Sequence, residues 1–157
     1  MSRTWVLISD AARARLFEVA EHDGMTEIAC YSNPSRRSMT HNKADHSPSR
    51  THDSHGPGRH IIEVHTSSRE KSERQFASSI VEALEHGIAQ HQCGRLILVA
   101  PPHFLGVLHA KLTPSLEKVM VGEIHNDLVS CSTQELADRL HEAFPRECHQ
   151  QLRRAAL

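Results

Sequence analysis

Five basic residues lie close together in a segment that has almost no apolar side chains. The segment from Ser32 to His60 contains these five residues and only two acidic ones, Asp45 and Asp53, so its net charge is +3. The whole 157-residue chain has a net charge of −1. The basic residues are Arg36, Arg37, Lys43, Arg50 and Arg59. Such side chains bind phosphate, and the hydroxyl and amide side chains between them can bind phosphate and sugar oxygens. The pattern predicts a segment that binds RNA.

A glycine pair near the end of the same segment extends this prediction. In the sequence from His55 to His60, two glycines flank Pro57, and residues without a Cβ let the backbone approach a ligand closely. The predicted RNA contacts therefore also include His55, Gly56, Gly58 and His60. The alternative is a solvated loop that binds nothing.

The chain has 14 histidines, and some of them suggest a metal site. His52 and His55 are separated by two residues, and His60 with Asp45 or Asp53 could complete a tetrahedral zinc or nickel site, because neutral imidazole is a common metal ligand. Structural zinc sites usually contain cysteine, which the segment lacks. Polar loop residues are the favoured interpretation, and a metal at His52, His55 and His60 is the alternative. Four further histidines are expected on helices, as surface or interface residues: His86, His91, His103 and His109.

Groups that could act as nucleophiles are few and scattered. Ser9-Asp10 follows a predicted strand, Cys93 is expected to be a small buried residue, and Cys148-His149 lies in a polar tail. The sequence therefore predicts a protein that is not an enzyme. Its four cysteines occur singly, which suits a reducing cytoplasm, and the apolar run at residues 5–8 is too short for a signal peptide or a membrane span.

Apolar runs predict the strands, and apolar residues three and four positions apart predict the helices. The expected strands are residues 5–8, 14–20, 25–31, 96–100 and 119–124. The expected helices are residues 68–92, 104–112 and 132–144, with one helical turn at 115–118. Asp23-Gly24 predicts a hairpin between the second and third strands, and the apolar run at 96–100 predicts a central parallel strand.

Capping residues predict where the longest helix begins and ends. A capping box made by Ser67 and Glu70 predicts its start, and Gly94 predicts its end. Its polar face is expected to be solvated and carries Arg69, Lys71, Glu73, Arg74, Glu82 and Glu85. A second capping box, Ser132 with Glu135, predicts the start of the last helix.

These elements predict one α/β domain over residues 1–145, with a mixed β-sheet sandwiched by helices. A long loop at residues 32–66 interrupts it, and a polar tail follows at 146–157. The loop is expected to be mobile, because so few apolar side chains cannot offset an ordering entropy of about 1–2 kcal/mol per residue.

Three stretches of the sequence resemble the bacterial host-attachment protein family. They are the start from Trp5 to Phe17, the helical segment Glu73–Ala77, and Arg95–Gly106 with its Ala-Pro-Pro-His-Phe-Leu-Gly run. That family is similar in fold to the middle domain of archaeal and eukaryotic class-1 peptide release factors. The resemblance implies a fold of that RNase H-like, translational-machinery type.

The resemblance also implies a partner. In those release factors a loop with a Gly-Gly-Gln tip leads into the long helix, and residues 32–66 hold that place here without such a motif. The expected function is therefore non-catalytic binding to the ribosome, rRNA or tRNA, in ribosome protection, rescue or translational regulation. The alternatives are a protein–protein interaction factor that supports surface attachment and a histidine-rich metal-binding or metal-sensing protein. No membrane partner is expected.

Overall fold

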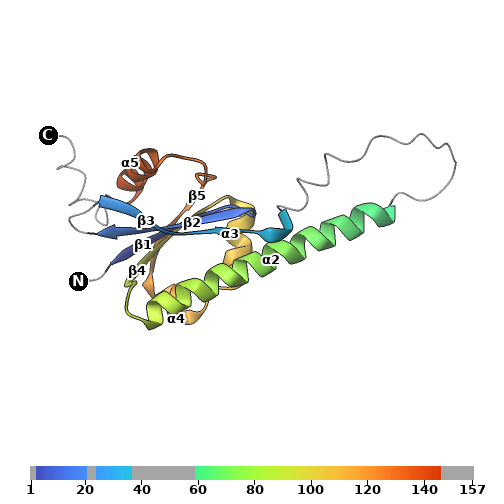
Figure 1. Cartoon of the computed structure of the whole chain (residues 1–157), viewed down its shortest axis with the longest axis horizontal. Coiled ribbons are helices and arrows are strands. Elements are labelled where there is room, and N and C mark those ends of the chain that lie inside the picture. The colour runs from blue at the N-terminus through green and yellow to red at the C-terminus, as the bar shows by residue number, and fades with distance from the viewer. Residues whose placement is uncertain (1–2, 21–23, 37–58, 146–157) are drawn as a thin grey trace.

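The computed structural model of this protein describes residues 3–20, 24–36 and 59–145, and for residues 59–67 the helical backbone alone. The elements in chain order are β1 (Thr4–Ser9), β2 (Arg13–Ala20), β3 (Gly24–Ser32), α2 (Arg59–Ala89), β4 (Arg95–Ala100), α3 (Pro102–His109), α4 (Pro114–Val119), β5 (Met120–His125) and α5 (Thr133–Ala143). Residues 34–36, just after β3, are also helical. Figure 1 shows α2, α3 and α4 on one face of the sheet and α5 on the other. The predicted α/β class is confirmed.

The five strands form one mixed sheet in the order β3-β2-β1-β4-β5. β1 pairs with β2, and β2 with β3, in antiparallel register. β4 is parallel to both of its neighbours, β1 and β5. The predicted hairpin partners and the predicted central parallel strand are therefore both confirmed.

Each face of the sheet has its own apolar core, because side chains alternate along a strand. On β1, Trp5 and Leu7 pack beneath α2, α3 and α4, whereas Val6 and Ile8 pack beneath α5. Gly87 brings α2 close to β1, since a Cβ at this position would overlap the Trp5 ring. The larger core lies on the α2 side and positions that helix on the sheet.

The start of α2 differs from the prediction. The helix begins at Arg59, so residues 59–66 are helical instead of belonging to the loop, and the capping box of Ser67 and Glu70 is wrong. The helix has 31 residues and contains no proline. Once the packed part has nucleated, each further residue adds a backbone hydrogen bond, so the helix extends backward until Pro57-Gly58 precedes its first residue. Residues 59–66 of the predicted loop therefore belong to the helix, and its residues 37–58 lie outside the described part of the chain.

The end of α2 also differs from the prediction, because His91 ends the helix instead of Gly94. The backbone N–H of Gln92 donates to Gly87 O at 2.9 Å, and the N–H of His91 donates to Ile88 O at 2.9 Å. His91 has φ 57°, in the left-handed region. This pair of bonds is a Schellman motif, which glycine usually forms. His91 consequently lies just beyond the helix on which it was expected.

Two of the shorter helices begin at capping residues, and the cap at Ser132 is the predicted one. Thr113 caps α4 through a bond from the Leu116 N–H, with proline at the first helical position. Ser132 and Glu135 form the predicted capping box of α5. In the described part of the chain, no helix combines the length and the apolar content that crossing a bilayer requires.

The left-handed backbone at His91 gives the first prediction. His91→Gly should raise the free energy of unfolding by about 0.5–1 kcal/mol, because the strain of a Cβ at positive φ outweighs the added entropy of glycine in the unfolded chain. Denaturant titration measures this change. The control His86→Gly, inside α2, should lower stability by about 1 kcal/mol. A loss of stability in His91→Gly would contradict the assignment.

Candidate functional site

The carboxyl ends of the parallel strands meet at one edge of the sheet. β1, β4 and β5 end there at Ser9, Ala100 and His125, where β2 begins and β3 ends. After β1 the chain continues to β2 on one side, and after β4 it continues to β5 on the opposite side. Ligands of open α/β sheets usually bind at such a point, where the strand order reverses. We call this edge of the sheet the carboxyl edge. Figure 1 shows the N-terminal turns of α2 projecting beyond it.

The turn after β1 is fixed by its own side chain. Asp10 Oδ1 accepts hydrogen bonds from the backbone N–H groups of Ala12 and Arg13, both at 2.7 Å. The neighbouring Ser9 hydroxyl is fully buried and has no hydrogen-bond partner within the described residues. A substrate in solution therefore cannot reach Ser9, and Asp10 holds the turn.

Asn33 joins this turn to α2. Its side chain is buried, Nδ2 donates to Ala11 O at 3.0 Å, and Oδ1 accepts from the Ser72 hydroxyl at 3.1 Å and from the Ser35 N–H at 3.2 Å. A buried amide with these partners is satisfied on both its donor and acceptor sides. The chain that leaves β3 is thus attached both to the sheet and to the helix.

A buried carboxylate makes the second connection. Glu73, on α2, is 2% exposed, and its Oε1 accepts from Arg36 Nη2 at 2.8 Å and from Arg69 Nε at 3.2 Å. His103 Nε2, on the first turn of α3, lies 2.8 Å from Oε2. We call these four residues the Glu73 clamp. It joins the segment after β3, α2 and α3, and it corrects the expectation that Glu73 lies on a solvated face.

The clamp stabilises the ionised form of its central carboxyl. Burial by itself would raise the pKa of Glu73, but hydrogen bonds from His103, Arg69 and Arg36 outweigh it and hold the pKa below its ordinary value. The three partners remain 30–72% exposed, so water screens their side of the interaction. The clamp is therefore a structural ion network with one buried centre.

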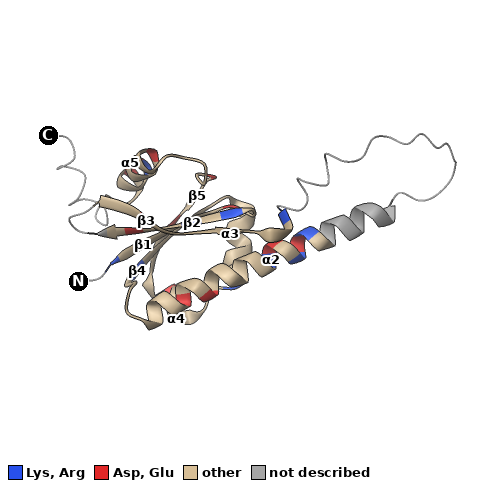
Figure 2. Ribbon diagram, viewed as in Figure 1, with Lys and Arg blue, Asp and Glu red and all other residues tan. Residues whose placement is uncertain are grey.

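Other basic side chains on the described part also serve the fold. Arg15 Nη1 donates to the carbonyls of Val129, at 3.2 Å, and Cys131, at 2.8 Å, and its guanidinium pairs with Glu27. Arg13 Nη2 donates to the Ser130 hydroxyl at 3.1 Å. Figure 2 shows the basic and acidic residues of α2 interspersed near the carboxyl edge.

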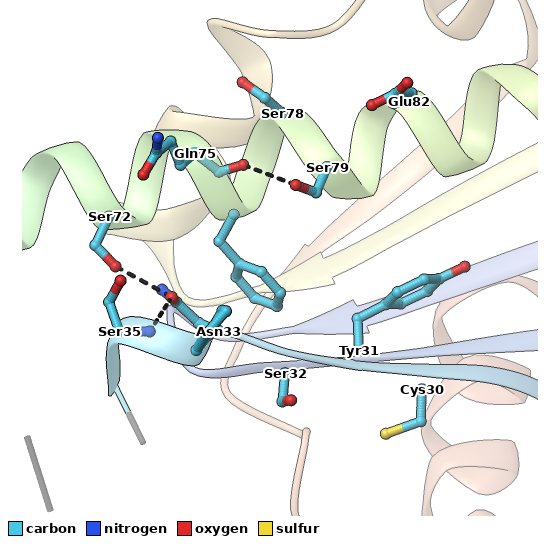
Figure 3. A pocket seen from close by; sticks show the side chains of 12 residues that line it. Cys30, Tyr31, Ser32, Asn33, Ser35, Ser72, Gln75, Ser78, Ser79 and Glu82 are labelled. Carbon is cyan, nitrogen blue, oxygen red and sulfur yellow. Dashed lines mark hydrogen bonds between the residues drawn. The ribbon is translucent and has the colours of Figure 1, made fainter. Parts of the chain in front are cut away.

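A groove of about 710 Å³ opens beside the clamp, between the last residues of β3 and the middle of α2. We call it the β3–α2 groove, and Figure 3 shows its lining side chains. Tyr31 and Phe76 supply its apolar part. Burial raises the pKa of the Tyr31 hydroxyl. The remaining lining residues are Cys30, Ser32, Asn33, Pro34, Ser35, Ser72, Gln75, Ser78, Ser79 and Glu82.

Most of the predicted ligand-binding residues lie outside the described part of the chain. These residues are Arg37, Lys43, Arg50, His52, His55, Gly56 and Gly58. Arg59 and His60 are the first two residues of α2, and only their backbone is described. Arg36 lies in the Glu73 clamp, so its guanidinium already has a carboxylate partner.

The predicted metal site also lies outside the described part, since His52, His55 and the side chain of His60 are not described. Among the side chains of residues 3–20, 24–36 and 68–145, no group of three or more His, Cys, Asp and Glu could hold a metal ion. Glu123 pairs with two histidines, His109 Nε2 at 2.7 Å and His125 Nε2 at 2.6 Å. Hydrogen bonds, chiefly from His125, lower the pKa of Glu123. Cys93 is buried as predicted, which raises its thiol pKa.

The spacing of residues along α2 could have predicted that Glu73 is buried, whereas its residue type alone suggests an exposed position. Glu73 lies three and four positions before Phe76 and Ala77, both of which are buried on the sheet-facing side of α2. Positions three and four apart share a helix face, so the apolar stripe could have placed Glu73 in the core. Its partners come from other elements, and helix periodicity cannot identify them.

The buried carboxylate gives the second prediction. At neutral pH, Glu73→Gln should lower the free energy of unfolding by roughly 1–2 kcal/mol, because charge-assisted bonds to a buried group are lost. The folded pKa is depressed, so this stabilisation is present above the unfolded carboxyl pKa of about 4.3 and is lost as the pH falls through the folded pKa. Denaturant titrations at pH 7 and pH 3 should therefore show a difference that shrinks in acid.

The control is Glu70→Gln, which removes an exposed carboxylate paired with Arg74 and should cost less than about 0.5 kcal/mol at either pH. An equal effect of Glu73→Gln at both pH values would contradict the role assigned to its charge.

Comparisons with known proteins find a partial sequence match and a structural similarity. An uncharacterized protein of Rickettsia prowazekii (strain Madrid E), RP470, is 34% identical over 71 residues, which are 44% of this chain and 47% of that protein. The match thus spans about half of that relative. The crystal structure of the archaeal translation termination factor aRF1 is similar over 91% of this chain and 40% of its own length, with 10% identity and a TM-score of 0.45.

The family model gives the broader match. Its description is "Protein required for attachment to host cells", and it covers residues 5–140, from the second residue of β1 into α5. The covered range includes the Glu73 clamp and the β3–α2 groove. The chain therefore belongs to the family of proteins required for attachment to host cells.

Proposed function

We propose that this protein is a non-catalytic RNA-binding module that acts on the ribosome, rRNA or tRNA. The contact is made by the basic segment that begins at Arg36 and ends at the first turn of α2. The observation that carries the proposal is the separation of charge along the chain. Residues 32–60 have five basic and two acidic side chains, whereas the rest of the chain has 13 basic and 17 acidic ones.

This separation matters for a polyanion. Nucleic acid would be repelled by the rest of the chain, with a net charge of −4, and attracted by a segment with +3. A chain with an even spread of charge would offer no such preferred side. Arg37, Lys43, Arg50 and Arg59 are the basic residues proposed to contact phosphate, and Gly56 with Gly58 suits close approach.

The start of α2 supports the same proposal. The first turn of the helix, from Arg59, contains no acidic residue. The free N–H groups and the positive end of the helix dipole at such a terminus favour phosphate. His55, His60 and Arg59 are close to this terminus in the sequence, so the proposed contacts form one continuous region.

The clamp gives the segment a rigid base. Arg36 at the start of the segment and Arg69 after its end both bind Glu73, and Asn33 holds the same chain to Ser72. A binding segment attached to a rigid scaffold is the usual arrangement for recognition. Ribosome protection, rescue and translational regulation are the processes in which such a module would act.

The third prediction separates binding from folding. Replacing Arg37, Lys43 and Arg50 with Gln should weaken binding to purified bacterial ribosomes and to tRNA, and should reduce the salt dependence of log K by roughly 0.7–0.9 for each lost contact. Sedimentation and filter binding at several salt concentrations measure both quantities. Arg36 is kept, because its loss would also weaken the clamp.

A matched control removes three positive charges outside the basic segment, so that the net charge of the chain changes by the same amount. Lys111, Lys118 and Arg139 are exposed on the body, and their replacement by Gln should leave RNA binding close to that of the wild type. Equal effects of the two triple variants, or no RNA binding by the wild type, would contradict the proposal. A partner protein recovered without RNA would instead favour an interaction factor for host attachment.

A further inference from the structure

β3 is an edge strand whose outer side lies next to the β3–α2 groove. Within the described strands it pairs with β2 alone. Its first half is interrupted by a register shift opposite Leu16 and Phe17 and carries Glu27, both of which discourage strand addition. Its last four residues, Ala29–Ser32, have regular pairing and no charge. The part of the edge that faces the groove is thus the unprotected part.

The backbone groups that point outward can be identified. The Asn33 N–H donates inward, to Ala12 O on the sheet, at 2.8 Å. Ser32 pairs with Arg13 and Cys30 with Arg15. Because inward and outward groups alternate along an antiparallel strand, the N–H and C=O groups of Ser32 and Cys30 point away from β2.

The serine hydroxyls on the α2 wall of the groove act as acceptors, and the Gln75 amide is the side-chain donor among the α2 residues that line it. The Ser78 hydroxyl donates to Arg74 O at 2.9 Å, and the Ser79 hydroxyl donates to Gln75 O at 3.2 Å. The Ser72 hydroxyl donates to Asn33. Their protons are used, so oxygen lone pairs remain for a ligand.

Glu82 adds a negative charge to this wall. Its carboxylate is exposed and pairs with no other described residue. Figure 3 shows it on α2 at the end of the groove where Cys30 lies, whereas Ser72 lies above Asn33 at the other end. The groove therefore combines an open strand edge with an acceptor-rich, negatively charged wall.

This chemistry selects among possible occupants. Phosphate would meet the Glu82 carboxylate and hydroxyl groups that have no free proton, so RNA is disfavoured here. A second copy of the chain would add its own β3, and residues 24–32 contain no Lys or Arg to pair with Glu82. An extended peptide with a basic residue can form backbone hydrogen bonds to the open edge of β3 and an ion pair with Glu82.

We infer that the β3–α2 groove binds an extended peptide of a partner protein, which adds a strand to β3 at Cys30 and Ser32 and places a Lys or Arg side chain against Glu82. Backbone hydrogen bonds give such a complex its affinity, and the side-chain position beside α2 gives it selectivity. This site is separate from the proposed RNA-binding segment, and either can fail without the other.

Synthetic peptides of alternating Thr and Val around a central Lys or Glu test the inference on the full chain. Fluorescence anisotropy should show that the wild type prefers the Lys peptide by about three- to fivefold, as expected for one surface ion pair. Glu82→Lys should reverse the preference. Glu117→Lys, at an exposed position of α4, is the matched control and should not change it.

Amide NMR spectra of the wild type give a second measurement that needs no variant. The Lys peptide should shift the amide signals of Cys30 and Ser32, and an RNA oligonucleotide should not. No peptide binding at about 1 mM, a preference that ignores Glu82, or shifts of these amides by RNA would overturn the inference. Concentration-dependent dimers that pair through β3 would overturn it as well.

Discussion

The burial of one carboxylate, Glu73, constrains the arrangement of the whole carboxyl edge. A charge removed from water must be paired and hydrogen-bonded, and here the partners come from three places in the chain: Arg36 after β3, Arg69 on α2 and His103 on α3. The apolar core beneath Phe76 holds the helix on the sheet, while the carboxylate sets which residues meet at its end. The bonds of Asn33 attach the same corner to the turn after β1.

That corner adjoins two regions of opposite chemistry. The basic segment proposed to bind RNA follows Arg36 in the sequence, and the groove beside the corner has a wall with serine acceptors and the Glu82 carboxylate, which pairs with no other described residue. A protein with both surfaces could hold an RNA and a protein partner at once.

Much of the fold could be predicted from local patterns. All five strands and the two caps at Thr113 and Ser132 follow from short-range rules. The Ser67 and Glu70 box obeys the same rule and fails, because the chain before it can continue the helix. Before Ser132 the chain instead forms a turn, in which Arg15 binds the carbonyls of Val129 and Cys131. The candidate site was harder to predict, since the partners of Glu73 are 30 or more residues away in two of three cases.

The central claim is that Arg36 and Glu73 act as a unit that fastens the chain after β3 to α2. A double-mutant cycle with Arg36→Gln and Glu73→Gln, measured by equilibrium unfolding at neutral pH, tests this claim most directly. The account predicts a coupling free energy of roughly 1–2 kcal/mol between the two positions. Changes that add within about 0.3 kcal/mol would show that the residues act independently and would contradict it.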